Sequence, residues 1–312
     1  ITNYEYDPSG RFLTKSTDIE RLSTSFDYNY SNGTVKSETN PYGLTTSYLY
    51  DSWFKKTTTT DYLGKKNSYV YARSGQKTIV TSTADDGSIS EETFDDLGRK
   101  IKAGSKNIMG TFSYVDYVYD IYDRNYKVSE PYFGSAGSQW SETKYDAYGR
   151  VIQNIAFTGK VTDITYSGLT TTVSDGTISK TSIKNAIGNV VSMTDTPGGT
   201  IKYAYFANGN LKESDYAGVK TTIEQDGWGR KTKLVDSSAG TYTYVYNGFG
   251  ETTSTTTPNG TTNYILDAVG KVTQKTISGT NTNSKTTYYY DPSSKLLTSS
   301  KFEDLANGAN TI

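Results

Sequence analysis

Two residue types that carry much of enzyme chemistry are missing from this 312-residue sequence, which has no cysteine and no histidine. Without cysteine the chain forms no disulfide and no thiolate zinc site. Without histidine it lacks the commonest general base and the commonest transition-metal ligand, so no ordinary Ser–His–Asp triad can form. The sequence therefore predicts no catalytic residue, no metal site and no cofactor, and we expect a protein that is not an enzyme.

An excess of one charge and long apolar runs are also missing. The chain carries 32 basic against 33 acidic residues, so electrostatics give no reason to expect a nucleic acid or an anionic membrane as partner. No apolar run approaches the roughly 18 residues of a membrane span. The first residues, ITNY, show neither a signal peptide nor an initiator methionine. We expect the chain to be a fragment of a larger protein.

Tyrosine supplies most of the aromatic surface. Hydrophobic residues make up only 34% of the chain, which has 29 Tyr against 10 Phe and 3 Trp. A tyrosine buries a large ring and keeps a hydroxyl for water or a partner, which suits a thin wall whose side chains are half covered. We expect most of these rings to stack as ladders between neighbouring strands.

One phrase recurs: an aromatic or apolar residue, Asp or Asn, two variable residues, Gly, and then Lys, Arg, Glu or Asn. Residues 6–11, 94–99, 145–150, 246–251 and 266–271 read YDPSGR, FDDLGR, YDAYGR, YNGFGE and LDAVGK. Asp and Asn can cap a turn, and Gly supplies a positive φ at its end. The residues predicted to build these structural turns are Tyr6, Asp7, Gly10, Asp51, Asp95, Gly98, Tyr145, Asp146, Gly149, Gly229, Asn247, Gly250, Asp267, Gly270 and Asp291.

The spacing of the turns predicts an all-β fold. Glycine falls at positions 188, 198, 209, 218, 229, 240, 250, 260 and 270, so a turn recurs about every ten residues and leaves about six for each strand. Residues between turns alternate as in strands: Tyr242, Tyr244 and Tyr246 share one face. Two strands and two turns make a repeat of about 20–22 residues, and such hairpins must pair edge to edge in a continuous twisted sheet.

The repeat is predicted to cover the whole chain, residues 1–312. It is regular over 1–100 and 185–292, whereas glycines at 104, 110, 134 and 137 break the spacing within 101–184. Taken alone, the period also fits a β-helix, a propeller or a fibre of hairpins.

A family resemblance separates these alternatives. The phrases at 6–11 and 145–150, and YDP at 290–292, resemble the YD repeats of the Rhs family; NPYGLTTSYLYD at 40–51 matches the family's second turn, its strand and its next YD anchor. The resemblance implies a ribbon of hairpins that winds into a spiral β-shell. In bacterial relatives this shell commonly encloses a toxic C-terminal polypeptide, and related shells occur in insecticidal toxin complexes and in animal teneurins.

Function and location follow from this resemblance. We expect a structural segment of an Rhs/YD-repeat shell, secreted or displayed on a bacterial cell surface, whose partners are flanking repeats and a C-terminal cargo domain of the same polypeptide, with secretion machinery or cell-surface molecules as further candidates. The alternative is an adhesin module that binds carbohydrate or protein through exposed rings. Shells of this family often end in a self-cleaving Asp-Pro-x-Gly segment, but Asp291-Pro292-Ser293-Ser294 lacks that Gly, so the protease activity is not expected here.

Overall fold

The computed structural model describes residues 2–306 and 310–311. All regular elements in this part of the chain are β-strands, and none of its segments is a helix that could span a membrane. Contacts between Cα atoms divide the chain into two compact units, residues 1–164 and 165–312, and the division falls within β16 (Val161–Ser167). The prediction of an all-β chain of antiparallel hairpins in an open, twisted sheet is confirmed.

Unit 1 is built from strands of two to nine residues. They are β1 (Asn3–Tyr6), β2 (Leu13–Thr17), β3 (Ser23–Asn29), β4 (Thr34–Thr39), β5 (Thr45–Tyr50), β6 (Lys56–Thr60), β7 (Lys66–Ser74), β8 (Lys77–Thr83), β9 (Ile89–Phe94), β10 (Lys100–Lys106), β11 (Phe112–Tyr119), β12 (Asn125–Ser129), β13 (Tyr132–Phe133), β14 (Trp140–Tyr145) and β15 (Val151–Ile155).

Unit 2 continues the same pattern of short strands joined by tight turns. Its strands are β17 (Thr170–Ser174), β18 (Ser179–Lys184), β19 (Val190–Asp195), β20 (Thr200–Tyr205), β21 (Leu211–Tyr216), β22 (Val219–Gln225), β23 (Lys231–Asp236), β24 (Gly240–Tyr246), β25 (Thr252–Thr257), β26 (Gly260–Leu266), β27 (Val272–Gly279), β28 (Thr282–Tyr290), β29 (Leu297–Asp304) and β30 (Asn310–Thr311).

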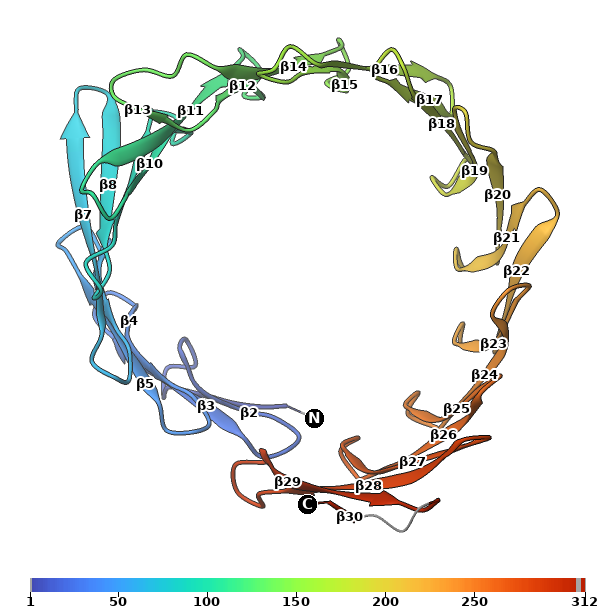
Figure 1. Ribbon diagram of the computed structural model, residues 1–312. Helices are drawn as coiled ribbons and strands as arrows, with labels where there is room; N and C mark the ends of the chain where they lie inside the picture. Colours follow the sequence, from blue (N-terminus) through green and yellow to red (C-terminus); the bar gives the residue numbers. More distant parts are fainter. Residues whose placement is uncertain (1, 307–309, 312) are drawn as a thin grey trace. The chain divides into compact units, whose positions relative to one another are not determined.

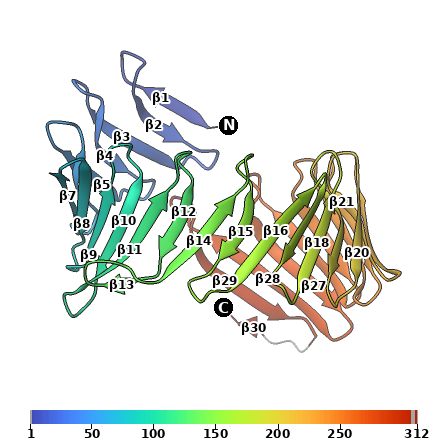
Figure 2. The same ribbon diagram turned by 90° about the horizontal axis from the view of Figure 1, so that it is seen from above.

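Outside the stretch around β13, strands pair with their sequence neighbours, as in β23–β24 and β24–β25, and these pairs are antiparallel. Within each unit the strands lie side by side, so that alternate turns gather at opposite edges of the sheet (Figures 1 and 2). The edge with the recurring phrase is called here the YD edge. At this edge the register shifts by one residue, as where Val245 faces Ser254 but Tyr246 faces Thr252. This bulge gives the turn its extra residue.

The stretch with irregular glycines departs from the simple hairpin order. Strand β11 pairs with β12 and also with β13, and β12 pairs with β14. Gly104 and Gly137 have no positive φ; a Cβ at these positions would lie 2.7 Å from the Tyr114 ring and 2.9 Å from the Ser129 Cβ. These two glycines therefore permit close packing rather than turns, which explains why their spacing does not follow the turn period.

The described residues form a sheet without an enclosed hydrophobic core. Among the described residues no hydrophobic side chain is buried, and the buried polar ones are Thr93, Ser129 and Ser284. Strand residues are mostly half-buried or exposed, and the two classes alternate in some strands, such as β5 and β16. In β24, Tyr242, Tyr244 and Tyr246 are half-buried while Val245 is exposed. Stability must therefore come from contacts between neighbouring repeats rather than from one central core.

Candidate functional site: the turns of the YD edge

The backbone of each YD turn closes through two hydrogen bonds. In the turn at 226–230 the N–H of Gly229 donates to the carbonyl of Asp226 at 3.0 Å, and the N–H of Asp226 donates to the carbonyl of Arg230 at 2.9 Å. Gly229 has a φ of +82°, in the left-handed region that other residues avoid. The same pair of bonds closes the turns that begin at Asp51, Asp95, Asp120, Asp146, Asn185, Asn247 and Asp267.

The Asp or Asn side chain caps the turn from within. Asp226 Oδ1 accepts the N–H groups of Trp228 and Arg230, both at 3.0 Å. Asp51, Asp95, Asp146, Asn247 and Asp267 accept the equivalent pair of N–H groups. A short side chain with an oxygen on Cγ reaches both groups, which favours Asp and Asn at this position. Phe206 begins a turn that is closed by the same two backbone bonds, so the backbone conformation does not require the cap.

The structure places the predicted turn residues as follows. Gly10, Gly98, Gly149, Gly229, Gly250 and Gly270 all have φ between +71° and +89°. Tyr6 and Tyr145 end the strands that enter their turns, and Asp7 accepts the N–H groups of Ser9, Arg11 and Phe12. At Asp291, which accepts the N–H groups of Ser293 and Ser294, the left-handed position belongs to Lys295.

Two further YD turns keep the left-handed residue without a glycine, at Phe54 with φ +61° and at Asp123 with φ +63°. The recurring phrase did not identify these residues, because it was defined by the glycine.

The side chain of the fifth residue of the turn complements that of the first. Arg230 donates through Nε to Asp226 Oδ2 at 2.7 Å, and Arg150 donates in the same way to Asp146. Partial burial raises the pKa of the Asp226 carboxyl, but the N–H and the guanidinium of Arg230 lower it more, so the net pKa lies below its ordinary value. Where the first residue is the neutral Asn247, the fifth is Glu251, which accepts from Asn247 Nδ2 at 2.6 Å. In these three turns Asp is thus paired with Arg, and Asn with Glu.

The expectation of stacked tyrosine ladders was wrong. In the described part of the chain only a minority of the tyrosines enter ring–ring contacts, for example Tyr28 with Phe12 and Tyr114 with Phe112. The tyrosine that precedes a YD turn instead donates its hydroxyl to a backbone carbonyl at the same edge of the preceding repeat. These bonds join Tyr50 to Val35, Tyr71 to Lys56, Tyr119 to Lys100, Tyr145 to Asn125, Tyr205 to Val190, Tyr246 to Lys231 and Tyr290 to Val272 at 2.6–3.0 Å.

The fifth residue also reaches forward to the next YD turn. Arg230 lies over the Tyr246 ring, 4.8 Å from its centroid, and its Nη1 donates to the Asn247 carbonyl at 3.2 Å. Arg124 lies in the same way over Tyr145 at 4.5 Å, and Lys271 over Tyr290 at 5.2 Å. We call these forward contacts from the fifth residue to the next turn, together with the tyrosine hydroxyl bonds, the turn spine. The turn spine links consecutive repeats along one edge, where the strand hydrogen bonds end.

A second polar cluster holds the short strand β13 against β10 and β11. Tyr132 donates its hydroxyl to Asp116 Oδ2 at 2.7 Å, and Lys102 Nζ lies 3.1 Å from Asp116 Oδ1. Lys102 also lies over the rings of Tyr114 and Tyr132, at 4.8 and 5.1 Å. The sequence carried no periodic signal for this cluster, because the three polar partners come from three separate strands.

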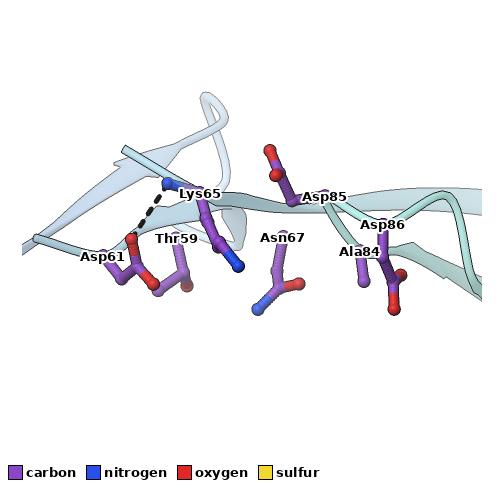
Figure 3. A pocket seen from close by; sticks show the side chains of 7 residues that line it. All are labelled: Thr59, Asp61, Lys65, Asn67, Ala84, Asp85 and Asp86. Carbon is purple, nitrogen blue, oxygen red and sulfur yellow. Dashed lines mark hydrogen bonds between the residues drawn. The ribbon is translucent and has the colours of Figure 1, made fainter. Parts of the chain in front are cut away.

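At the opposite edge of unit 1, a shallow polar groove of about 470 Å³ lies between the turns at 61–65 and 84–88. Asp85 and Asp86 point to opposite sides of the ribbon there (Figure 3). Asp86 Oδ1 accepts hydrogen bonds from the N–H and the hydroxyl of Ser88. Within the described residues no group of three or more acidic side chains is arranged to hold a metal ion.

Solved structures share this fold. No protein-family model and no curated protein matches the sequence. The crystal structure of TcdB2–TccC3 superimposes on 99% of this chain with a TM-score of 0.61 and 15% sequence identity. The crystal structures of TcdB2–TccC3–Cdc42 and of TcdB2–TccC3 without its hypervariable C-terminal region give TM-scores of 0.61 and 0.60 with 13% and 12% identity, over 100% and 99% of this chain.

This chain spans about a fifth of the length of those solved chains, between 19% and 22%. They are Rhs/YD-repeat shell proteins, so the resemblance predicted from the YD phrases is confirmed at the level of the fold.

Proposed function

We propose that this chain is a non-enzymatic wall segment of an Rhs/YD-repeat shell, secreted or displayed on a bacterial surface, which encloses a C-terminal toxin polypeptide or forms a scaffold there. The single observation that carries the proposal is a sheet one layer thick, without a buried hydrophobic side chain among the described residues, whose edge is held by the turn spine. Such a sheet can extend by adding repeats on either side, which is what a wall needs.

The similar structures give a second line of support. One of them is described as lacking a hypervariable C-terminal region, which fits a shell whose contents vary while its wall is retained. For this chain we infer flanking repeats and a C-terminal cargo segment of the same polypeptide as its partners. Export through secretion machinery belongs to the same proposal.

Limited proteolysis of the natural polypeptide that contains this chain tests the wall. The sequence that follows the repeats should resist protease while the wall is intact, and it should become sensitive in a Gly229→Val/Gly250→Val variant whose YD turns are strained. The Gly227→Val/Gly248→Val variant is the control, because neither glycine has a positive φ and the space around both is open. Equal sensitivity in the parent and the strained variant would contradict an enclosing wall.

An adhesin module is the second candidate, and exposed rings favour it: Tyr148, Trp228 and Phe249 are 86–92% exposed. Aromatic rings stack on the apolar faces of sugars as well as on protein side chains. A glycan array probed with the labelled chain separates the two functions, since a wall segment should give no saturable binding. Saturable binding to one glycan class, lost on Trp228→Ser, would favour the adhesin.

A further inference from the structure

Asparagine followed by glycine is the dipeptide most prone to deamidation. A glycine has no side chain to shield its backbone nitrogen, and this nitrogen is the atom that attacks the asparagine side chain. Four such pairs lie within the described residues, and they begin at Asn32, Asn208, Asn247 and Asn259. All four occupy turns between strands. Because the reacting dipeptide is the same in each pair, differences in reactivity must come from the fold.

The turns at Asn32 and Asn208 hold the asparagine side chain by hydrogen bonds. Asn32 Oδ1 accepts the N–H and the hydroxyl of Thr34, at 3.0 and 2.8 Å. Asn208 Oδ1 accepts the N–H of Asn210 at 3.1 Å, and Asn208 Nδ2 donates to Gln225 at 3.3 Å. Two hydrogen bonds therefore fix the orientation of each side chain.

The cap of the YD turn holds Asn247 by three hydrogen bonds. Its Oδ1 accepts the N–H groups of Phe249 and Glu251, both at 3.0 Å, and its Nδ2 donates to Glu251 at 2.6 Å. Deamidation requires the side chain to rotate until Cγ lies against the nitrogen of the next residue. A capped asparagine must break its hydrogen bonds before it can do so, which slows the reaction.

Asn259 differs from the other three. It lies in the short turn between β25 and β26, its side chain is exposed, and neither its Oδ1 nor its Nδ2 is hydrogen-bonded to a described residue. Its backbone N–H donates to Thr257 Oγ1 at 3.2 Å, which leaves the side chain free to rotate. Exposure does not set Asn259 apart, since Asn32 and Asn208 are exposed as well. The missing cap does.

We propose that Asn259 is the asparagine of the described chain that deamidates first, and that its isoaspartate product loosens the edge opposite the YD edge. In the reaction the Gly260 nitrogen attacks Asn259 Cγ. The new N–Cγ bond forms as the Cγ–Nδ2 bond breaks, and Nδ2 leaves as ammonia with the proton that the Gly260 nitrogen gives up. Water then opens the succinimide at either carbonyl carbon and yields aspartate or isoaspartate. The net reaction consumes water and releases ammonia, so it needs no further reactant.

The loosening follows from the close packing around this turn. Isoaspartate adds a methylene to the backbone just before Gly260. A Cβ on Gly260 would clash with the Ser278 carbonyl, and a Cβ on Gly279 would clash with the Asn259 carbonyl, so the backbones of the two turns are already in contact. Because the longer backbone has no free space there, we expect the isoaspartyl chain to weaken the pairing of Gly260 with Thr257 and Gly279.

Peptide mapping by mass spectrometry tests the proposal on the intact chain. The folded chain is incubated in mildly alkaline buffer, and the conversion of amide to carboxyl is followed at each of the four asparagines. We expect Asn259 to react about tenfold or more faster than the other three, because at least two hydrogen bonds hold each of those. In denaturant the caps are lost, and the four rates should converge.

Two variants serve as controls. Asn259→Gln keeps an amide at this position but would have to form a larger ring, so the peptide that contains residue 259 should no longer change. Glu251→Ala frees Asn247 Nδ2 and should speed the reaction at Asn247 while the rate at Asn259 stays that of the parent. Circular dichroism should show both variants folded.

Three results would overturn the assignment of the site: equal rates at the four asparagines of the folded chain, a slower reaction at Asn259 than at a capped asparagine, or a ranking that persists unchanged in denaturant. Hydrogen exchange on the purified isoaspartyl chain tests the loosening. Faster exchange at Gly260 and Gly279 than in the parent is expected, and unchanged protection at both would overturn that part of the proposal.

Discussion

Arg230 lies over the ring of Tyr246, with its Cζ 4.8 Å from the ring centroid, and it simultaneously forms an ion pair with Asp226 in its own turn. One side chain thus completes its own turn and covers the aromatic residue of the next. Because the Tyr246 hydroxyl donates back to the Lys231 carbonyl, the two repeats are joined in both directions. The recurring Tyr and the recurring Arg or Lys of the YD phrase are therefore parts of one contact.

Removing the hydroxyl of Tyr246 should weaken this junction selectively. Tyr246→Phe keeps the ring beneath Arg230 and loses the 2.8 Å bond to the Lys231 carbonyl, so we expect a loss of about 0.5–1.5 kcal/mol in the free energy of unfolding. Chemical denaturation measures it. Tyr148→Phe is the matched control, because Tyr148 is 86% exposed, and it should change stability little. Equal effects of the two changes would show that the hydroxyl bond contributes nothing.

The charge match within the turn can be tested by reversing it. Asn247→Asp places a carboxylate where Asn247 Nδ2 now donates to Glu251 at 2.6 Å, so we expect destabilisation by about 0.5–1 kcal/mol, a value limited by solvent screening. Adding Glu251→Arg recreates the pair seen at Asp226 and Arg230 and should restore stability. A double-mutant cycle in denaturant measures the coupling energy between positions 247 and 251. Additive effects of the two substitutions would show that the two side chains do not stabilise each other.

Acid should weaken the repeat at the capping carboxylates. The hydroxyl of Ser9, together with the N–H groups of Phe12, Ser9 and Arg11, lowers the pKa of Asp7 to about 2. The folded state thus favours the charged carboxylate of Asp7. The stabilisation that this carboxylate gives to the folded state is complete above the unfolded pKa of about 3.9, and it is lost as the pH falls toward 2. Asp7→Asn cannot titrate and should narrow the stability difference between pH 5 and pH 2. Denaturation curves at those two pH values give the comparison, and an unchanged difference would contradict it.

The parts of the fold that could be predicted from the sequence are those fixed by local chemistry. Asp226 and Gly229 specify the turn because a short acceptor caps N–H groups two and four residues on, and glycine tolerates positive φ. The alternation in β24 likewise follows from strand geometry and assigns Tyr242, Tyr244 and Tyr246 to one face, as observed.

What could not be predicted depends on contacts between repeats. The ladder hypothesis failed because the tyrosine rings are covered by cations such as Arg230 and Lys271 from the preceding turn. The repeat period predicts which turn lies next, but it does not show that the cation of one turn reaches the ring of the next. Phe54 was missed as a left-handed residue because its conformation is imposed by the Asp51 cap and by strand pairing. Gly104 breaks the turn period for a different reason: the Tyr114 ring leaves no room for a Cβ at this position, and no turn lies there.

Stability should be distributed along the chain, and one strained turn can show it. Gly250 has a φ of +89°, and its nearest neighbour around a new Cβ, Arg230 Nη1, is 3.7 Å away. Gly250→Val is therefore opposed by backbone strain rather than by a clash, at a cost of about 1–3 kcal/mol. Gly248→Val in the same turn is the control, because Gly248 has no positive φ and open space around it.

Hydrogen exchange followed residue by residue should show faster exchange in β24, β25 and their pairing partners in the Gly250→Val variant, while β1 to β10 keep the protection of the parent. If protection were lost uniformly along the chain, neighbouring repeats would have to share one cooperative core, which the absence of buried hydrophobic side chains among the described residues argues against.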